Sequence, residues 1–196
     1  MSQSDGSSMA NGFLMERDRS VLIVIDVQES LCPVMDDPRK VLMNGARLAR
    51  GARILGLPVV VTEQYPKGLG PTMHDIRAEV PRDADHCAYL EKLTFSSAAD
   101  PVVMRHLDGL DRRQAVICGI EMHVCVLQTA LGLRGRGWDV FVVSDACSSR
   151  LPTSESAALV RMTGVGVQPV TTEMVLFEWL GGKQSPVFKD IMGLIR

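Results

Sequence analysis

The stretch VLIVID at residues 21–26 decides the fold. Val21–Ile25 is a continuous run of aliphatic residues, and Asp26 ends it. A run that is apolar at every position is typical of a strand buried on both faces of a parallel sheet. Similar runs recur along the chain and predict five further strands, the second of them short: Pro58–Thr62, Ala88–Glu91, Ala115–Gly119, Val140–Ser144 and Val165–Val170.

Helical patterns lie between these runs, at Val41–Leu55, Pro101–Leu107, Val124–Leu133 and Ser154–Met162. Alternating strands and helices predict the α/β class, as a three-layer α/β/α domain with a doubly wound, mostly parallel, six-stranded sheet and right-handed crossovers. Ligands bind such sheets outside the carboxyl ends of the strands, so polar residues directly after the apolar runs are candidates for chemistry. Near the C-terminus, Ser185-Pro186 predicts the start of a helix that packs on the core or on a partner subunit.

Length and composition favour one domain. The chain has 196 residues, of which 46% are hydrophobic, enough for one sizeable core. We expect a flexible arm at residues 1–18 and a single domain at residues 19–196. Residues 1–12 are polar, which indicates neither a secretory signal nor a membrane anchor. No run approaches the roughly 20 apolar residues of a membrane-spanning helix. A soluble, cytoplasmic protein is therefore expected.

The charge balance and the cysteines narrow the choice of partners. The net charge of −2 provides no basic field for nucleic acid or for an anionic membrane, so a small-molecule substrate fits better. The five cysteines are odd in number and form no CxxC pair. We therefore expect a reducing compartment, no metal and no cofactor. Cys118 and Cys147 lie in or just after apolar runs, which indicates a packing role.

Two charged residues follow predicted strands. Asp26 ends the first one, where a partly dehydrated carboxylate can act as a base or can equally cap a helix. Lys92 follows Ala88–Glu91. A solvated surface lysine is the usual role of such a residue, but an ammonium near the same sheet edge would favour the ionised forms of a thiol and a carboxyl group.

Cys125 follows the strand Ala115–Gly119 by a short turn and precedes a helical run. A sulfur at a helix N-terminus is expected to have a lowered pKa and to act as a nucleophile, and free backbone amides of the turn can bind an oxyanion. A buried structural cysteine is the alternative. The combination of strand, turn, cysteine and helix favours the nucleophile.

The chain resembles the isochorismatase-like cysteine hydrolases from about Ser20 to Leu180. The matching segments are VLIVIDVQ (residues 21–28), EKLTFSS (91–97) and GIEMHVCVLQTALGLRGRGWDVFVVSDACSSR (119–150). The resemblance implies a catalytic triad of Asp26, Lys92 and Cys125. It also implies a cis peptide at Ile120-Glu121 that aims the amides of Glu121 and Cys125 at the oxyanion.

Four residues beside these motifs are candidates for the substrate pocket, each with packing or loop structure as the alternative: Gln28, Gln64, Tyr65 and Phe95. His123 is expected to be a wall or surface residue, because the family triad uses no histidine. The family's strand order, 3-2-1-4-5-6, would place Asp26 and Cys125 on neighbouring strands. Lys92 would start roughly 10 Å from the first strand and must reach inward.

The resemblance also indicates to which branch of the superfamily the chain is most similar. Nicotinamidases of this superfamily bind a metal through an Asp-x-His motif and a further histidine, whereas residues 62–70 contain no histidine. The segment TEQYPKGLGPT most resembles the isochorismatase-domain-containing branch. We therefore expect a hydrolase of a small amide, carbamoyl or related C–N substrate that forms an acyl-enzyme, and a homo-oligomer as is usual among relatives. The alternatives are a catalytically silent binding or scaffold protein and a redox role for Cys125.

Overall fold

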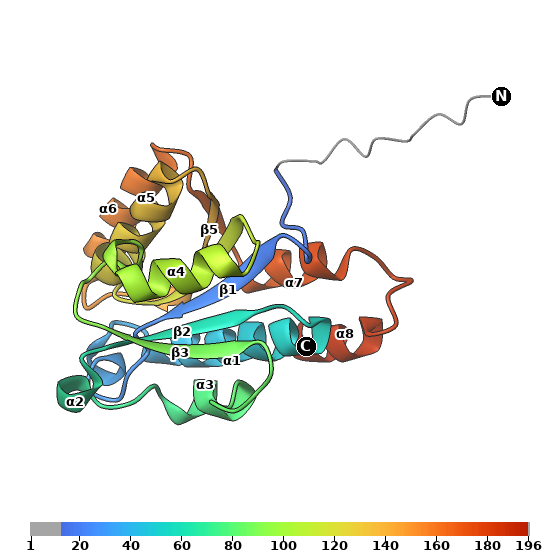
Figure 1. Cartoon of the computed structure of the whole chain (residues 1–196), viewed down its shortest axis with the longest axis horizontal. Helices are drawn as coiled ribbons and strands as arrows, with labels where there is room; N and C mark the ends of the chain where they lie inside the picture. Colours follow the sequence, from blue (N-terminus) through green and yellow to red (C-terminus); the bar gives the residue numbers. More distant parts are fainter. Residues whose placement is uncertain (1–12, 196) are drawn as a thin grey trace.

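Six parallel strands form the centre of the computed structural model, which describes residues 13–195 (Figure 1). The strands are β1 (Ser20–Ile25), β2 (Val59–Gln64), β3 (Cys87–Lys92), β4 (Gln114–Ile120), β5 (Asp139–Ser148) and β6 (Gln168–Val170). Their order in the sheet is β3-β2-β1-β4-β5-β6, and every neighbouring pair is parallel. The predicted fold class and strand order are therefore confirmed.

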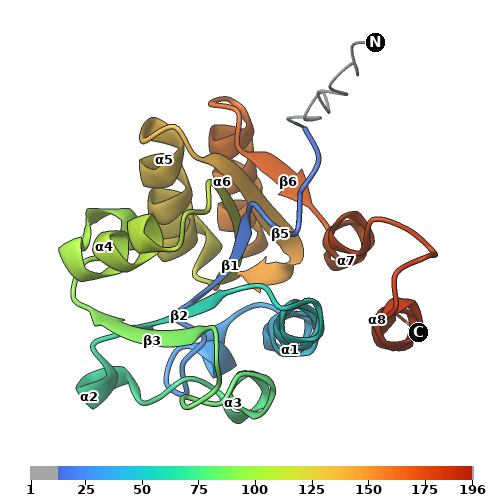
Figure 2. The ribbon, with the colours of Figure 1, turned by 45° about the vertical axis from the view of Figure 1, so that its right-hand side comes forward.

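Helices cover both faces of the sheet. They are α1 (Pro38–Leu55), α2 (Pro66–Leu69), α3 (His74–Glu79), α4 (Pro101–Gly109), α5 (Leu127–Gly135), α6 (Pro152–Thr163), α7 (Thr172–Leu180) and α8 (Phe188–Ile195). Figure 2 shows α1, α3, α7 and α8 on one face and α4, α5 and α6 on the other. None of the helices within residues 13–195 is both long enough and apolar enough to cross a membrane.

The central strands are buried because the sheet separates two helical layers. Every residue of β1 and of β4 is buried, as the unbroken apolar runs predict. Ile25 pairs with Thr62 of β2 on one side and with Gly119 of β4 on the other. The carboxyl ends of these three strands therefore meet directly beside Asp26.

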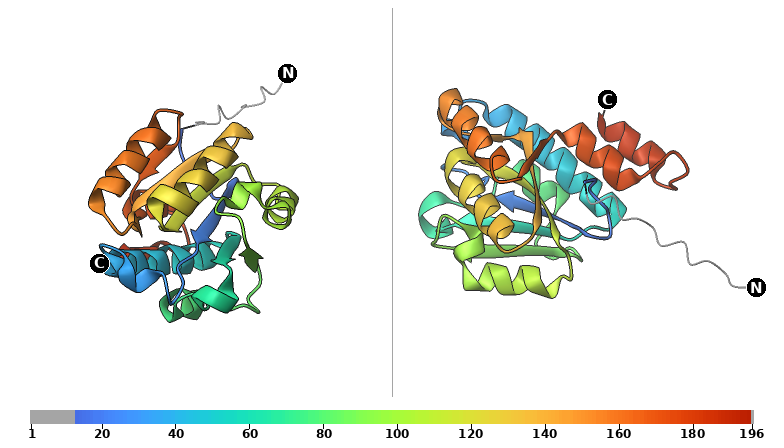
Figure 3. Two further views of the ribbon diagram at one scale, coloured as in Figure 1. Left: turned by 90° about the vertical axis from the view of Figure 1, so that its left-hand side faces the viewer. Right: turned by 90° about the horizontal axis from the view of Figure 1, so that it is seen from above.

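The C-terminal elements differ from the predicted ones. The strand expected at Val165–Val170 is shorter, because Gly166 lies in a turn with a φ of +83°. Helix α7 follows it and was not predicted. The last helix begins at Phe188, after a turn at Ser185. Figure 3 shows α7 and α8 beside α1, and buried Ile191 of α8 accounts for this packing on the core of the chain.

The folded part of the chain starts before the expected boundary at residue 19. Residues 1–12 of the predicted arm lie outside the described residues. Met15 is buried, and its backbone N–H donates a hydrogen bond to Glu178 Oε2 at 2.7 Å. The N–H of Glu16 donates to Gln114 Oε1 at 2.7 Å. Residues 15 and 16 therefore belong to the domain, and the prediction that the flexible arm extends to residue 18 is wrong.

Candidate active site

Asp26 is fixed at the end of β1 by the neighbouring strand. Its backbone N–H donates to Thr62 O at 3.2 Å, and Thr62 Oγ1 donates to Asp26 Oδ1 at 2.7 Å. Its φ of +51° lies in the left-handed region, which is unusual for a residue other than glycine. Within the described residues the carboxylate accepts no backbone N–H, so the alternative of a helix cap does not hold.

Lys92 reaches inward from the end of β3, past β2, to Asp26. Lys92 Nζ lies 2.6 Å from Asp26 Oδ2, and both side chains are 0% exposed. The ammonium also donates to Gln64 Oε1 at 2.8 Å and lies within hydrogen-bonding distance of the carbonyl oxygens of Thr94 and Phe95, at 3.1 and 3.2 Å. Such a pair, with its remaining donors satisfied, is the arrangement in which two buried charges are tolerated.

Cys125 faces this pair from the other side. It lies in a single π-helical turn, Met122–Val126, which joins β4 to α5, and it is only 7% exposed. Its thiol is near enough to Asp26 and Lys92 for the charges of both residues to shift its pKa. The structure thus brings Asp26, Lys92 and Cys125 together although they are far apart in the sequence.

The expectation of a lowered pKa for Cys125 is wrong. Burial, followed by the charge of Asp26, raises the pKa of the Cys125 thiol to about 12, and Lys92 opposes this increase only in part. The cysteine lies inside the π-helical turn rather than at a free helix N-terminus, and burial together with the Asp26 carboxylate outweighs any effect of the helix dipole on its pKa. At pH 7 a pKa of about 12 leaves about one thiol in 100,000 ionised. The thiol must therefore lose its proton to a neighbouring base in order to react.

The backbone amide of Glu121, just before the turn that carries Cys125, is free. The Ile120-Glu121 peptide is cis, at the position that the resemblance implied. The N–H groups of Val124 and Val126 both donate to Glu121 O, at 3.0 and 3.2 Å. The N–H of Glu121 itself makes no hydrogen bond to any of residues 13–195. A role of this amide, and of the Cys125 amide, in binding an oxyanion stays a prediction.

Two of the four pocket candidates are committed to structural hydrogen bonds. Gln28 Nε2 donates to Gln64 O at 3.0 Å and to Gly70 O at 2.7 Å, and its Oε1 accepts from Gln64 N at 2.7 Å. The side chain of Gln64 bonds Lys92 Nζ and, at 2.9 Å, Leu93 O. Gln28 therefore holds the loop after β2, and Gln64 holds Lys92; a role of either amide in binding a substrate stays a prediction.

Tyr65 and Phe95 are the exposed pair of candidates, at 52% and 56%. Tyr65 lines an open hollow of about 400 Å³ together with Leu93 and the residues around them. Cys125 is not among the residues that line it: Tyr65, Pro66, Lys67, Glu91, Lys92, Leu93 and Asp100. The substrate-binding role of Tyr65 and Phe95 stays a prediction.

Thr62 is the site residue that sequence reasoning missed. It is fully buried, and both its hydroxyl and its carbonyl bind Asp26. Its position as the one polar residue at the end of the run PVVVT was a usable signal, because the ends of neighbouring parallel strands meet. Among the described residues, no three His, Cys, Asp or Glu side chains are grouped so that they could hold a metal ion. The absence of a metal stays an expectation.

A doubly wound parallel sheet with a buried Asp–Lys pair beside a cysteine defines an isochorismatase-like α/β protein. The chain belongs to the isochorismatase domain family, whose profile matches residues 20–174. Isochorismatase domain-containing protein 2 of Xenopus laevis is 39% identical over 185 residues, which are 94% of this chain and 86% of that protein. Isochorismatase domain-containing protein 1 of Danio rerio is 38% identical over 182 residues, 90% of this chain but only 61% of that protein.

A solved structure supports the same relationship. The structure of MAR1 ribonuclease from Caenorhabditis elegans superposes with a TM-score of 0.86 at 35% identity, covering 93% of this chain and 92% of the other. The similarity therefore extends over nearly the whole domain.

Proposed function

We propose that this protein is a cysteine-dependent hydrolase of a small amide, carbamoyl or related C–N substrate. The observation that carries the proposal is the fully buried pair of Asp26 and Lys92, whose charged groups lie 2.6 Å apart and whose charges both act on the Cys125 thiol. A nucleophile, a base and a group that orients the base are thereby gathered at one place, which is the arrangement that covalent catalysis requires.

In the first half-reaction, Asp26 takes the thiol proton as the sulfur attacks the carbonyl carbon. This route needs no free thiolate, in keeping with the raised pKa of Cys125. The tetrahedral oxyanion is stabilised by the free amide of Glu121, together with that of Cys125. Asp26 then returns the proton to the leaving nitrogen, the C–N bond breaks, and a thioester remains on Cys125.

In the second half-reaction, water hydrolyses the thioester. Asp26 takes a proton from water, the resulting hydroxide adds to the thioester carbonyl, and the C–S bond breaks. The proton then returns to the sulfur, which restores the thiol and releases the acid. Lys92 does not touch the substrate in this scheme, since its ammonium is already surrounded by four acceptors. It holds the Asp26 carboxylate in place between steps.

The test compares wild type with Cys125→Ala on a panel of small amides that includes nicotinamide and carbamoyl compounds. Ammonia release and intact mass are followed together. We expect ammonia or a covalent adduct with wild type and neither with the variant. Silence of wild type across the panel, with a Cys125 thiol that no amide electrophile modifies, would favour a catalytically silent binding protein instead.

Cleavage of RNA is the competing assignment, because a neighbour at 35% identity is described as a ribonuclease. The net charge of −2 offers little attraction for a polyanion, and the lysine of the site is buried against Asp26. We therefore expect no Cys125-dependent cleavage of a single-stranded RNA added to the same panel. RNA cleavage by wild type that is lost in Cys125→Ala would show that the substrate is a phosphodiester and not an amide.

We also propose a homo-oligomer in the cytoplasm. All five cysteines are free thiols, as in a reducing compartment.

The homo-oligomer is supported by large apolar side chains that are exposed near the ends of β2 and β3. They belong to Leu93, Tyr65 and Phe95, and Leu93 is 75% exposed. Light scattering should give a multiple of the monomer mass, and Leu93→Glu should lower it. Val160→Glu, at an equally exposed position on α6, serves as control. A wild type of monomer mass would contradict this proposal.

A further inference from the structure

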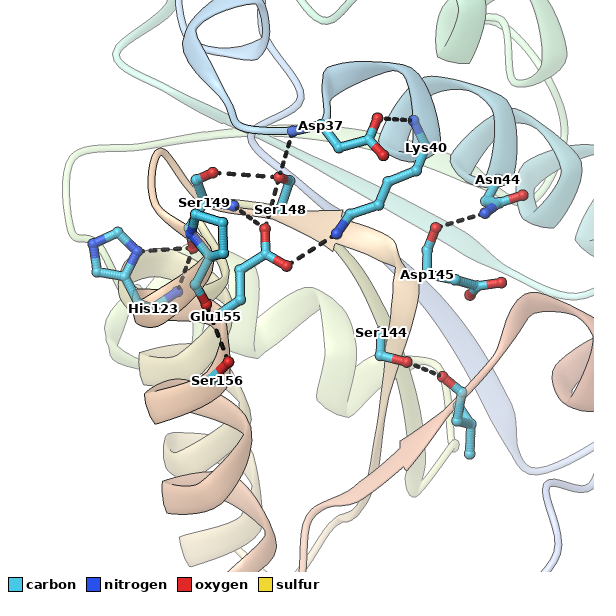
Figure 4. A network of polar contacts seen from close by, with 12 residues as sticks. Asp37, Lys40, Asn44, His123, Ser144, Asp145, Ser148, Ser149, Glu155 and Ser156 are labelled. Carbon is cyan, nitrogen blue, oxygen red and sulfur yellow. Dashed lines mark hydrogen bonds and ion pairs between the residues drawn. The ribbon is translucent and has the colours of Figure 1, made fainter.

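The turn that carries Cys125 is held from the side opposite the thiol. His123 lies two residues before Cys125 in the same π-helical turn. Two residues along a helical turn correspond to a rotation of about 160–200°, so the side chains of His123 and Cys125 point to opposite sides. Cys125 lies on the side of Asp26, whose charge raises the pKa of its thiol. His123 Nδ1 lies 2.9 Å from Ser149 Oγ, just beyond the end of β5 (Figure 4).

Ser149 is bound through each of its polar groups. Its backbone N–H donates to Glu155 Oε1 at 2.8 Å, and its carbonyl accepts from Asp36 N at 2.8 Å. Its hydroxyl accepts the backbone N–H of His123 at 3.4 Å and makes the contact with the His123 ring. The residue is fully buried. It therefore connects the turn of Cys125 with α6 and with the segment before α1.

Glu155 anchors this connection from α6. Besides Ser149 N, its Oε1 accepts the hydroxyl of Ser148 at 2.8 Å, and its Oε2 lies 2.9 Å from Lys40 Nζ of α1. Figure 4 shows Glu155 between Lys40 and the two serines, and His123 at the far end of the chain of contacts. Both carboxylate oxygens of Glu155 are thus bound, so its side chain is held in one position. Glu155 in turn holds Ser149.

We propose that His123, Ser149 and Glu155 form a brace that positions the Cys125 turn, with Ser149 as its central positioning residue. The inference rests on the proposed function and adds residues that act without touching the substrate. Its basis is that one helical turn carries both the thiol and the residue that is bound to Ser149, and that Ser149 is in turn bound to Glu155.

Ser149 holds both the backbone and the ring of His123. Its hydroxyl accepts the His123 backbone N–H at 3.4 Å and lies 2.9 Å from the ring nitrogen Nδ1. The other ring nitrogen points away from the serines in Figure 4. The two contacts together fix the orientation of His123 and hold the turn.

Loss of the brace should displace the Cys125 thiol, which would then be poorly placed to transfer its proton to Asp26. A misplacement of about 1 Å can lower a rate by about 100-fold. Acrylamide is a suitable probe, because it is an amide that alkylates a thiol irreversibly and requires no known substrate. The sulfur bonds to the terminal alkene carbon, and the thiol proton passes through Asp26 to the neighbouring carbon, so no other reactant is needed.

The experiment measures the rate of acrylamide adduct formation at Cys125 between pH 6 and 9, by mass spectrometry of the peptide. In wild type we expect a rate that changes little with pH, because Asp26 accepts the proton. In Ser149→Ala we expect a rate about 10- to 100-fold lower near pH 7 that rises about tenfold per pH unit, as for a thiol that must ionise unaided. A change in pH dependence is not a consequence of lower stability alone.

Two matched comparisons complete the design. Ser144→Ala removes a hydroxyl of β5 that donates to Val170 O at 3.1 Å and does not contact the turn, so this variant should react like wild type. His123→Ala should repeat the effect of Ser149→Ala at a half-buried position that tolerates truncation. His123→Asn places an amide near the position of Nδ1 and should restore the rate to within about threefold of wild type.

The possible results distinguish a failure of the brace proposal from a failure of the proposed function. If Ser149→Ala and His123→Ala match Ser144→Ala while Asp26→Asn is slow, the brace is refuted and the proposed function stands. If Cys125 of wild type reacts no faster than that of Asp26→Asn, the proposed function fails and the brace fails with it.

Discussion

Replacing Lys92 with methionine is expected to lower the free energy of unfolding by about 3–5 kcal/mol and to abolish reaction at Cys125. The substitution keeps the length of the side chain but leaves the Asp26 carboxylate without its cation. Asp26 is fully buried, and within residues 13–195 the hydroxyl of Thr62 is the one remaining hydrogen-bond donor to its carboxylate. An unpaired buried charge has a large desolvation cost. Urea denaturation with the intact-mass assay measures both effects.

Removing the carboxylate of the pair should lower the free energy of unfolding less than removing the ammonium. This difference between the two variants is part of the prediction. Asp26→Asn leaves Lys92 Nζ with Gln64 Oε1 and the carbonyls of Thr94 and Phe95. We expect a loss of about 1–3 kcal/mol, as for a buried group that keeps most of its hydrogen bonds. The double variant should regain part of the stability lost in Lys92→Met without any reactivity. Equal losses in the two single variants would show that Asp26 is not stabilised chiefly by Lys92.

Gly119→Ala is expected to destabilise the domain by about 2–6 kcal/mol, through backbone strain and overpacking together. Gly119 has a φ of +125°, and an added Cβ would lie 2.1 Å from the carbonyl oxygen of Ile25. The two residues are paired neighbours on β4 and β1. Alanine would force apart the strands that carry Asp26 and the turn of Cys125.

Gly193→Ala is the matched control for this prediction. Gly193 lies in α8, and a Cβ built there meets no atom within 4 Å. Alanine in a helix should be neutral or stabilising by up to about 1 kcal/mol. Denaturation midpoints of the two variants measure the difference. A Gly119→Ala protein as stable as Gly193→Ala would contradict the close approach of β1 and β4.

The sheet could be predicted because its strands are unbroken apolar runs. VLIVI at 21–25 and AVICG at 115–119 read as doubly buried strands, and both are central in the sheet. Helix α7 could not be found in this way. Its sequence, TEMVLFEWL, packs at the end of the domain and has little helical periodicity, although Thr171 caps its first turn and Gly181 ends it.

The candidate site was predictable in its residues but not in its electrostatics. Strand ends indicated where Asp26, Lys92 and Cys125 meet. The pKa of Cys125 depends on how deeply the turn is buried and on a carboxylate 99 positions earlier in the chain, and neither follows from local sequence. The expectation of a lowered pKa considered only the helix dipole that local sequence predicts. Burial has the larger effect on the pKa of Cys125. The contacts of Gln28 were missed for the same reason, since its partners lie in a loop that closes over it.

The two borders of the sheet differ in their capacity to recruit further chains. On one border, β6 is three residues long, and Pro169 at its centre has no N–H to offer. Strand addition there would gain very few backbone hydrogen bonds. On the other border, β3 is six residues long and ends in Glu91 and Lys92. Fibril-like growth of this domain would therefore have to start from β3, where the charge of Glu91 opposes it.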